Sequence, residues 1–137
     1  MSEKKVFLGG TCNKTVTNQT YRDKLIPMLK IDYFNPLVED WTEECYQEEL
    51  RQREECGYCL YVITPQMTGV YSIAEVIDDS NKRPEKTVFC YIEDFHGDRF
   101  VGHDLKALNK VGQMVEDNGG VFFTKLEDIA FFLNKNS

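Results

Sequence analysis

Short apolar runs alternate along the chain with longer segments in which apolar and polar residues recur at helical spacing. The clearest run, residues 58–64, has almost no polar side chains, which is typical of a strand covered on both faces. The pattern predicts strands at residues 4–8, 31–34, 58–64, 87–92 and 121–123. It predicts helices at residues 18–30, 42–55, 72–81, 104–117 and 126–133. Pro27 is expected to kink or shorten the first helix.

The predicted strands and helices follow one another in regular alternation, and the connections are too long for hairpins. This order indicates βαβ units and therefore a parallel sheet. A length of 137 residues suits one domain, spanning residues 1–137. We therefore predict an α/β fold, a flavodoxin-like three-layer sandwich with a five-stranded parallel sheet.

The composition limits the kinds of molecule that the chain is expected to bind. Hydrophobic residues make up 42% and charged residues 28% of the chain, as in ordinary globular proteins. The net charge of −7 opposes binding to nucleic acid polymers and to anionic membranes. No apolar run approaches the ~20 residues of a membrane-spanning helix. The N-terminus leads directly into a strand without a secretion signal, so a cytoplasmic location is expected.

Five cysteines are an odd number, which favours reduced thiols over a disulfide framework. Cys56 and Cys59 have the CxxC spacing, but they fall where a helix ends and a strand begins. A reactive thiolate is stabilised at the N-terminus of a helix, and these two cysteines follow the C-terminus of one. No second CxxC accompanies the pair, so we expect buried thiols and predict neither a metal nor a cofactor.

The carboxyl ends of parallel strands meet at one edge of a sheet, and small ligands bind in the crevice outside it. The first strand is followed there by Gly9-Gly10-Thr11-Cys12-Asn13. Glycines allow backbone amides to approach a ligand, and Thr11 and Asn13 supply hydrogen bonds. The segment is neither a GxGxxG motif nor a P-loop, and a plain tight turn explains it equally well.

Asn35 and Trp41 follow the second strand at the same edge. Trp41 could stack on a flat base, although a single tryptophan also serves as a core or rim anchor.

Glu75 follows the central strand and begins the next helix, so its carboxylate is the best candidate for chemistry. Ser72-x-x-Glu75 also has the spacing of a capping box, in which both side chains would bind backbone amides. Thr124-x-x-Glu127 repeats that spacing elsewhere, so the spacing alone does not decide between the two interpretations.

Several motifs resemble the nucleoside 2-deoxyribosyltransferase-like family over nearly the whole chain. They are Phe7-Leu8-Gly9-Gly10-Thr11, Asp32-Tyr33-Phe34-Asn35-Pro36, Tyr61-Val62-Ile63-Thr64-Pro65 and Gly69-Val70-Tyr71-Ser72-Ile73-Ala74-Glu75-Val76. The resemblance implies that Glu75 attacks the anomeric carbon of a (deoxy)ribosyl group, after which another base or water takes the sugar. A carboxylate suits this role because it can form a covalent glycosyl ester.

The chain departs from the family pattern in the loop before Glu75. Transferases of the family usually carry an aspartate there, whereas this chain has no acid between Pro65 and Glu75. Related nucleotide hydrolases have a small polar residue at this point, so Thr68 is expected to contact a 5′-phosphate or a ribose hydroxyl. The acid that protonates the leaving base then comes from Asp40, Glu49 or a neighbouring subunit. A solvated surface charge is the alternative for either residue.

The expected substrate is a nucleoside or nucleotide, bound by a homo-oligomer with shared active sites. The loop at residues 94–100 and the side chains of Arg99 and His103 are candidates to reach the neighbouring subunit. The predicted catalytic residues are Glu75, Asp40 and Glu49. The predicted substrate-binding residues are Gly9, Gly10, Thr11, Asn13, Asn35, Trp41, Thr68, Gly69, Tyr71 and Ser72.

Alternatives to sugar transfer remain open. The missing loop aspartate is compatible with an N-glycoside hydrolase of nucleoside 5′-monophosphates. A non-catalytic nucleotide-binding module would keep the pocket without the acid. A flavodoxin-like electron carrier is the weakest alternative.

Overall fold

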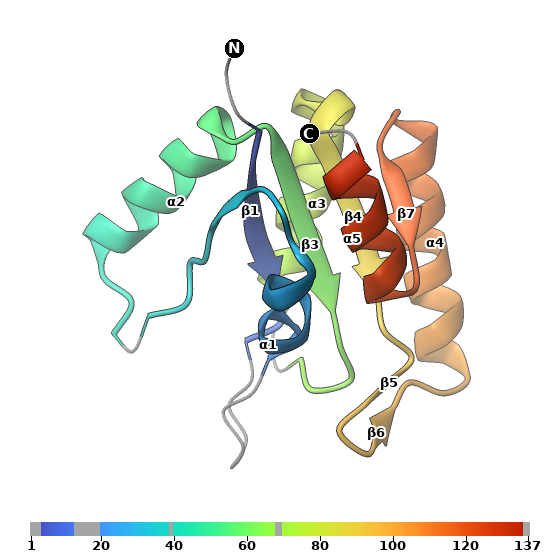
Figure 1. Ribbon diagram of the computed structural model, residues 1–137. Helices are drawn as coiled ribbons and strands as arrows, with labels where there is room; N and C mark the ends of the chain where they lie inside the picture. Colours follow the sequence, from blue (N-terminus) through green and yellow to red (C-terminus); the bar gives the residue numbers. More distant parts are fainter. Residues whose placement is uncertain (1–3, 13–19, 39, 68–69, 136–137) are drawn as a thin grey trace.

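The structure, a computed structural model, describes residues 4–12, 20–38, 40–67 and 70–135. Five parallel strands form one sheet in the order β2-β1-β3-β4-β7 (Figure 1). These strands are β1 (Lys5–Gly10), β2 (Asp32–Phe34), β3 (Tyr58–Ile63), β4 (Thr87–Tyr91) and β7 (Val121–Phe123). The predicted α/β sandwich with a five-stranded parallel sheet is therefore confirmed, and the architecture is consistent with a flavodoxin-like fold.

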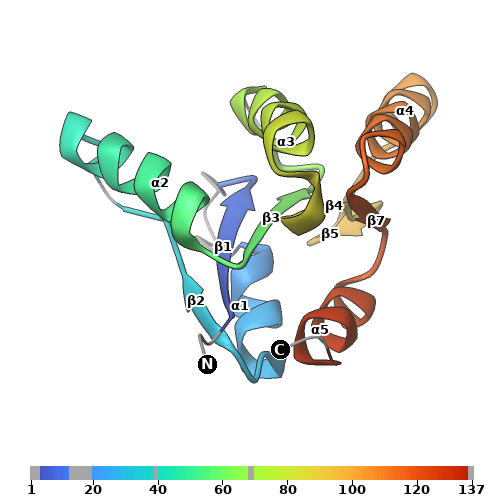
Figure 2. The ribbon, with the colours of Figure 1, turned by 90° about the horizontal axis from the view of Figure 1, so that it is seen from above.

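Helices cover both faces of the sheet (Figure 2). One face carries α2 (Glu43–Glu55), α3 (Tyr71–Lys82) and α4 (His103–Asp117), and the other carries α1 (Tyr21–Leu25) and α5 (Leu126–Lys135). The central strand β3 is buried throughout, because its side chains enter both layers in alternation. Tyr61 and Ile63 belong to the core under α3, whereas Leu60 and Val62 belong to the core under α1 and α5. Within the described residues, no helix combines the length and the apolar character needed to cross a bilayer.

The start of the chain differs from the prediction in two respects. The first strand continues to Gly10 instead of ending at Leu8. The described part of the first helix is short and ends at Leu25, where the 3₁₀ turn η1 (Ile26–Met28) takes over. Pro27 lies in that turn, which confirms its expected effect on the helix end.

The capping interpretation of Glu75 is wrong. Helix α3 begins at Tyr71, its N-cap residue is Val70, and no side chain caps it. Ser72 therefore lies inside the helix, where its hydroxyl cannot act as the N-cap group. A capping box is formed instead at α1, where the Thr20 and Asp23 side chains each accept a backbone N–H. The carboxylate of Glu75 is thus left for other contacts.

Two short segments were not predicted. Strands β5 (Asp94–Phe95) and β6 (Asp98–Arg99) pair antiparallel in a hairpin beyond the end of β4. The 3₁₀ turn η2 (Pro84–Lys86) leads into β4. In Figure 1 the hairpin lies at the edge toward which β1 and β3 point.

Gly10 occupies a position that no other residue fits. Its φ is +111°, and a Cβ atom there would lie 2.1 Å from the Val62 carbonyl oxygen. We expect Gly10→Ala to lower the free energy of unfolding by about 3 kcal/mol or more, because strained backbone and steric overlap add. Gly97, with φ +87° and no heavy atom within 4 Å of such a Cβ, is the matched control, with an expected loss of about 1 kcal/mol. Equal losses in denaturant unfolding of the two variants would contradict the steric explanation.

Candidate active site

Helices α2 and α3 lie on the same face of the sheet (Figure 2). Polar and aromatic side chains of the two helices interact across the space between them. The facing residues are Tyr46, Glu49 and Arg53 on α2, and Tyr71, Glu75 and Asp79 on α3. Spacings of three and four residues place each set on one side of its helix. We call these six residues the α2–α3 ladder. It has three levels, Tyr46 with Tyr71, Glu49 with Glu75, and Arg53 with Asp79.

The Arg53–Asp79 level is buried. The Asp79 side chain is 0% exposed, and Arg53 donates to it from Nη2 over 2.8 Å and from Nε over 3.3 Å. The Tyr61 hydroxyl of β3 donates to the same carboxylate, as does Nε of Arg83 over 2.9 Å. Burial acts to raise the pKa of Asp79, but these hydrogen bonds and the two arginine charges outweigh it and lower the pKa. Asp79 is therefore an ionised, multiply bonded anchor for both helices and the central strand.

Glu75, at the middle level, is buried but much less firmly held. Its side chain is 9% exposed. Its ion pair is with Arg53, whose Nη1 lies 3.6 Å from Oε2. Burial raises the pKa of Glu75 to about 7; the Arg53 charge opposes the rise, and the charges of Glu49 and Asp79 add to it. A carboxylate in this state exists in both protonation forms near neutral pH. Such tuning is typical of functional carboxylates.

Glu49 faces Glu75 in the ladder, and Trp41, which is outside the ladder, contacts Glu49 and Tyr46. The Trp41 indole N–H donates to Glu49 Oε2 over 2.6 Å, and its ring packs edge-on against Tyr46 at 5.3 Å between centroids. Trp41 is 57% exposed, so much of its surface stays open to a ligand. The structure thus brings together three residues that the sequence pointed to separately, Trp41, Glu49 and Glu75.

The Tyr46–Tyr71 level of the ladder is partly open to solvent. The Tyr71 side chain is hydrogen-bonded to Tyr46, and burial together with this bond raises the pKa of Tyr71 to about 12. The phenol is therefore neutral at ordinary pH. Tyr71 is nevertheless 54% exposed and Val70 is 74% exposed, so the first turn of α3 is open in the single chain. Ser72, in the same turn, is half-buried.

The loop after β1 is tied to the loop after β3 through Thr11. The Thr11 backbone N–H donates to the Val62 carbonyl, and its hydroxyl oxygen accepts from the Thr64 N–H over 3.0 Å. Gly9 has a packing role, because a Cβ there would lie 2.7 Å from the Tyr61 ring. Thr11 and Gly9 thus each have a role in holding the fold together. A contact of either residue with a substrate stays a prediction.

Two further predicted site residues have exposed side chains and do not belong to the ladder. Asn35 is exposed, and its side chain accepts the Leu37 N–H in a local turn. Asp40 is also exposed. Within the described part of the chain, no hydrogen bond or ion pair joins either side chain to Glu75. Asn13, Thr68 and Gly69 lie outside the described residues.

Of the candidates for contact with a neighbouring subunit, the side chains of Arg99 and His103 are exposed, whereas Phe95 and Phe100 of the 94–100 loop are buried. Arg99 pairs within its own hairpin, with Nε 3.0 Å from Asp94 Oδ1, and it also lies within 3.5 Å of Glu93. His103 begins α4 and is exposed. Exposed ion pairs of this kind contribute little stability, so they would not prevent Arg99 from changing partner.

Four residues near this site were not predicted from the sequence. Three of them, Arg53, Asp79 and Tyr46, belong to the ladder. For the two on α2, Tyr46 and Arg53, the recurrence of polar residues on one side of that helix was the available signal. Gln66, in the loop after β3, is the fourth. Its Oε1 is the one buried side-chain nitrogen or oxygen without a hydrogen-bond partner among the described residues, so it could accept a donor from a ligand or water. No sequence pattern distinguished it.

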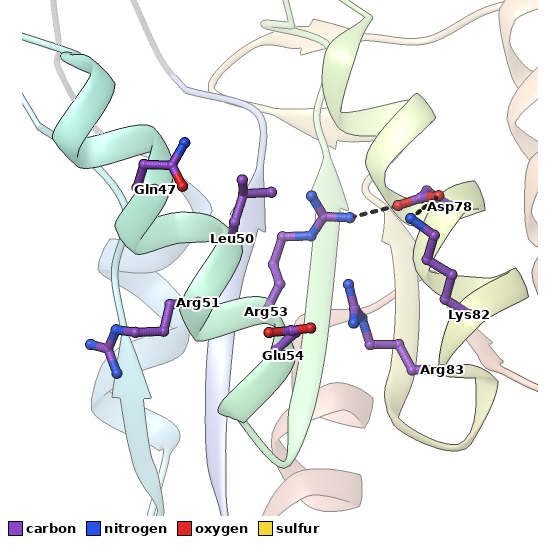
Figure 3. A pocket seen from close by; sticks show the side chains of 8 residues that line it. All are labelled: Gln47, Leu50, Arg51, Arg53, Glu54, Asp78, Lys82 and Arg83. Carbon is purple, nitrogen blue, oxygen red and sulfur yellow. Dashed lines mark hydrogen bonds and ion pairs between the residues drawn. The ribbon is translucent and has the colours of Figure 1, made fainter.

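A pocket of about 400 Å³ lies between α2 and α3, on the Arg53 side of the ladder (Figure 3). Its lining residues are Gln47, Leu50, Arg51, Arg53, Glu54, Asp78, Lys82 and Arg83. Each of its four basic residues is in an ion pair; Lys82, for example, lies 3.1 Å from Asp78. The charges of the wall are thus largely satisfied within the protein.

Among the described residues, no group of three or more His, Cys, Asp or Glu side chains is arranged to hold a metal ion. Cys56 and Cys59 are buried free thiols. Burial raises the pKa of both, to about 12 for Cys59, so they are neutral and unreactive.

Comparison with protein families gives a match. A family model described as "Nucleoside 2-deoxyribosyltransferase like" matches residues 3–95. A search of the curated proteins found no match. The matched segment includes β1 to β4, α1 to α3 and the whole ladder, whereas α4, β7 and α5 lie beyond it although β7 pairs with β4.

The raised pKa of Glu75 has a consequence for stability. The neutral form favours the folded state, so its contribution is complete below about pH 4.5 and is lost as the pH rises through about 7. We expect Glu75→Gln to be more stable than the wild type by about 1–3 kcal/mol at pH 8 and nearly equal to it at pH 4.5. Thermal or denaturant unfolding at both pH values measures the difference.

Glu127→Gln is the matched control, because Glu127 is an exposed glutamate in the first turn of α5. Its effect is expected to stay below about 0.5 kcal/mol at both pH values. A Glu75→Gln variant that behaves like this control would show that the carboxylate is not destabilised by burial.

Proposed function

The chain belongs to the nucleoside 2-deoxyribosyltransferase-like family, and on this premise we propose that it breaks the N-glycosidic bond of a nucleoside or nucleotide and transfers the (deoxy)ribosyl group to another base. Glu75 is the proposed nucleophile. The observation that carries the proposal is the state of this side chain, which is buried, faces Arg53 and has no capping role. A carboxylate that is used neither by a helix cap nor by a close ion pair is available for attack.

The proposed reaction has two displacements at one carbon. In the first, a Glu75 oxygen bonds to the anomeric carbon, the bond from that carbon to the base nitrogen breaks, and the base leaves with its electron pair and a proton from a general acid. In the second, the nitrogen of the incoming base attacks the same carbon. Glu75 is then released as carboxylate, and the proton of the incoming base returns to the general acid.

Glu49 is the better of the two proposed general acids. Its charge acts on Glu75, and it lies on the facing side of α2. Two carboxyl groups that face one substrate are the usual arrangement for retaining glycoside chemistry. Asp40 is exposed and stays a weaker candidate.

Trp41 and Tyr71 are proposed to contact the base and the sugar. Both are exposed aromatic residues adjoining the level of Glu49 and Glu75, and an aromatic ring face stacks readily on a base. Gly9, Gly10, Thr11, Asn13, Asn35, Thr68, Gly69 and Ser72 remain predicted substrate-binding residues.

Hydrolysis is the second candidate function, and the open mouth of the site favours it. Val70 and Tyr71 are exposed at the start of α3, so water can reach this end of the ladder in the single chain. Exclusion of water decides whether a glycosyl ester is hydrolysed or passed to an acceptor. Transfer therefore requires a cover, and we propose that a second copy of the chain supplies it. A hydrolase could work as a monomer.

The decisive experiment is a chromatographic screen of nucleosides and nucleoside 5′-monophosphates, with and without an acceptor base. A new nucleoside indicates transfer, and free sugar with free base indicates hydrolysis. We expect Glu75→Gln to lower turnover by about 10³-fold or more and Glu49→Gln by about 10²-fold. Glu127→Gln is the control and should retain the wild-type rate. Full turnover in Glu75→Gln would remove Glu75 from the mechanism, and nucleotide binding without any base release would favour a non-catalytic module.

The proposed cover is tested by the solution mass. Light scattering should give a multiple of the 15.9 kDa chain for a transferase. Replacing the exposed Val70 by Lys is then expected to shift the mass toward one chain and to raise the ratio of hydrolysis to transfer. A monomer that transfers efficiently would contradict the proposal of a second subunit.

A further inference from the structure

Arg53 is bound in a way that leaves one part of its guanidinium directed at Glu75. Nε and Nη2, on one edge of the planar group, both donate to Asp79, and Nη2 also reaches Asp78 over 3.2 Å. Asp79 is itself held by Tyr61 and Arg83. Because guanidinium is rigid and planar, fixing this edge also fixes the direction of Nη1. Nη1 is the atom that lies 3.6 Å from Glu75 Oε2.

The separation of 3.6 Å has a specific chemical consequence. It is longer than a good charge-assisted hydrogen bond, which spans about 2.7–2.9 Å. At this distance the positive charge still favours the ionised carboxylate. A bidentate pair would instead engage both oxygens of Glu75 and use the lone pairs that a nucleophile needs. Asp79, one helical turn away, receives that bidentate contact in place of Glu75.

We propose that Arg53 is a positioning residue for the reaction, and that its clamp on Asp79 directs Nη1 of the guanidinium at Glu75, where its positive charge favours the nucleophilic carboxylate without forming a hydrogen bond to it. This inference rests on the proposed function, in which Glu75 is the nucleophile. It adds a residue on α2 to the site and assigns Asp79 the task of orienting that residue.

The other charged and titratable groups around Glu75 do not replace Arg53. Glu49 from α2 and Asp79 from α3 are acids and oppose ionisation. Tyr71 from α3 and Tyr61 from β3 are neutral phenols, because burial raises the pKa of both. Arg53 is the cation that opposes the rise in the pKa of Glu75 caused by burial and by both acids.

The choice of arginine also has a reason. Arginine stays charged at every accessible pH, and its fork matches a carboxylate while leaving further N–H groups free. Lysine at this position could neutralise Asp79 as a point charge, but it could not bind Asp79 through two atoms and face Glu75 with a third. The three-residue arrangement of Asp79, Arg53 and Glu75 therefore depends on guanidinium geometry.

The test is a direct titration of Glu75 in the full chain. Protein labelled with ¹³C at the glutamate side-chain carboxyl is followed by NMR against pH, and the signal missing in Glu75→Gln identifies the residue. We expect Arg53→Met to raise the measured pKa of Glu75 by about 1 or more. Arg83→Met is the matched control, because it removes an arginine that also binds Asp79 but forms no ion pair with Glu75. Its titration of Glu75 should stay close to that of the wild type.

Two outcomes would overturn the inference. One is an unchanged pKa of Glu75 in Arg53→Met, and the other is an equal rise in Arg53→Met and Arg83→Met. Arg53→Gln, whose amide can still donate to Asp79, serves if the methionine variant does not fold. The same rise is expected in it.

Kinetics separate this inference from the proposed function. With an active substrate, the acid side of the pH profile of kcat/KM, which reports the free protein as the NMR titration does, should move to higher pH in Arg53→Met by the same amount. A merely structural role would lower the rate at all pH values without moving the profile, and would count against the inference. If the wild type released no base from any substrate while the NMR shift appeared, the proposed function would fail and the electrostatic link would stand.

Discussion

The contact on which this site depends is the buried ion pair of Arg53 and Asp79. Asp79 receives hydrogen bonds from α2 through Arg53, from β3 through Tyr61 and from the end of α3 through Arg83, so one carboxylate connects two helices to the central strand. A buried pair of this kind adds little net stability over a well-packed apolar contact, but the loss of one partner is costly because it leaves an uncompensated charge. The pair therefore fixes geometry more than it adds free energy, and it sets the relative position of the two helices that carry Glu49 and Glu75.

Glu75 differs from Asp79 in how well its charge is stabilised. Several hydrogen bonds stabilise the ionised form of Asp79, whereas Glu75 is buried with one cation at 3.6 Å and two acids near it. The protein thus places a poorly satisfied carboxylate beside a fully satisfied one. Functional residues are often held at such a cost to stability, because the reactivity of a group falls as its bonding is completed.

The fold could be predicted from the sequence to a large extent. Apolar runs such as residues 58–64 are local features, and a run without polar side chains must be covered on both faces, which leads to strands inside a parallel sheet. Boundaries were less certain where local signals compete. Ser72 and Glu75 have capping-box spacing, but the helix begins one residue earlier at Tyr71, whereas Thr20 and Asp23 form a capping box that was not foreseen. The extension of the first strand through Gly10 depends on its pairing with β3, which the local sequence does not reveal.

The sequence by itself determined the layers of the sandwich, the central position of the strand before Glu75 and, through its motifs, the family. Only the tertiary structure decided which residues surround that glutamate. Arg53 and Asp79 are 26 positions apart, and Trp41 meets Glu49 across the bend into α2. The spacing of apolar residues along the chain predicts whether a side chain is buried, because burial follows from the face of the helix or strand on which the side chain lies. The identity of the covering group depends on how two helices pack against a sheet, and that relation is set by contacts between distant parts of the chain.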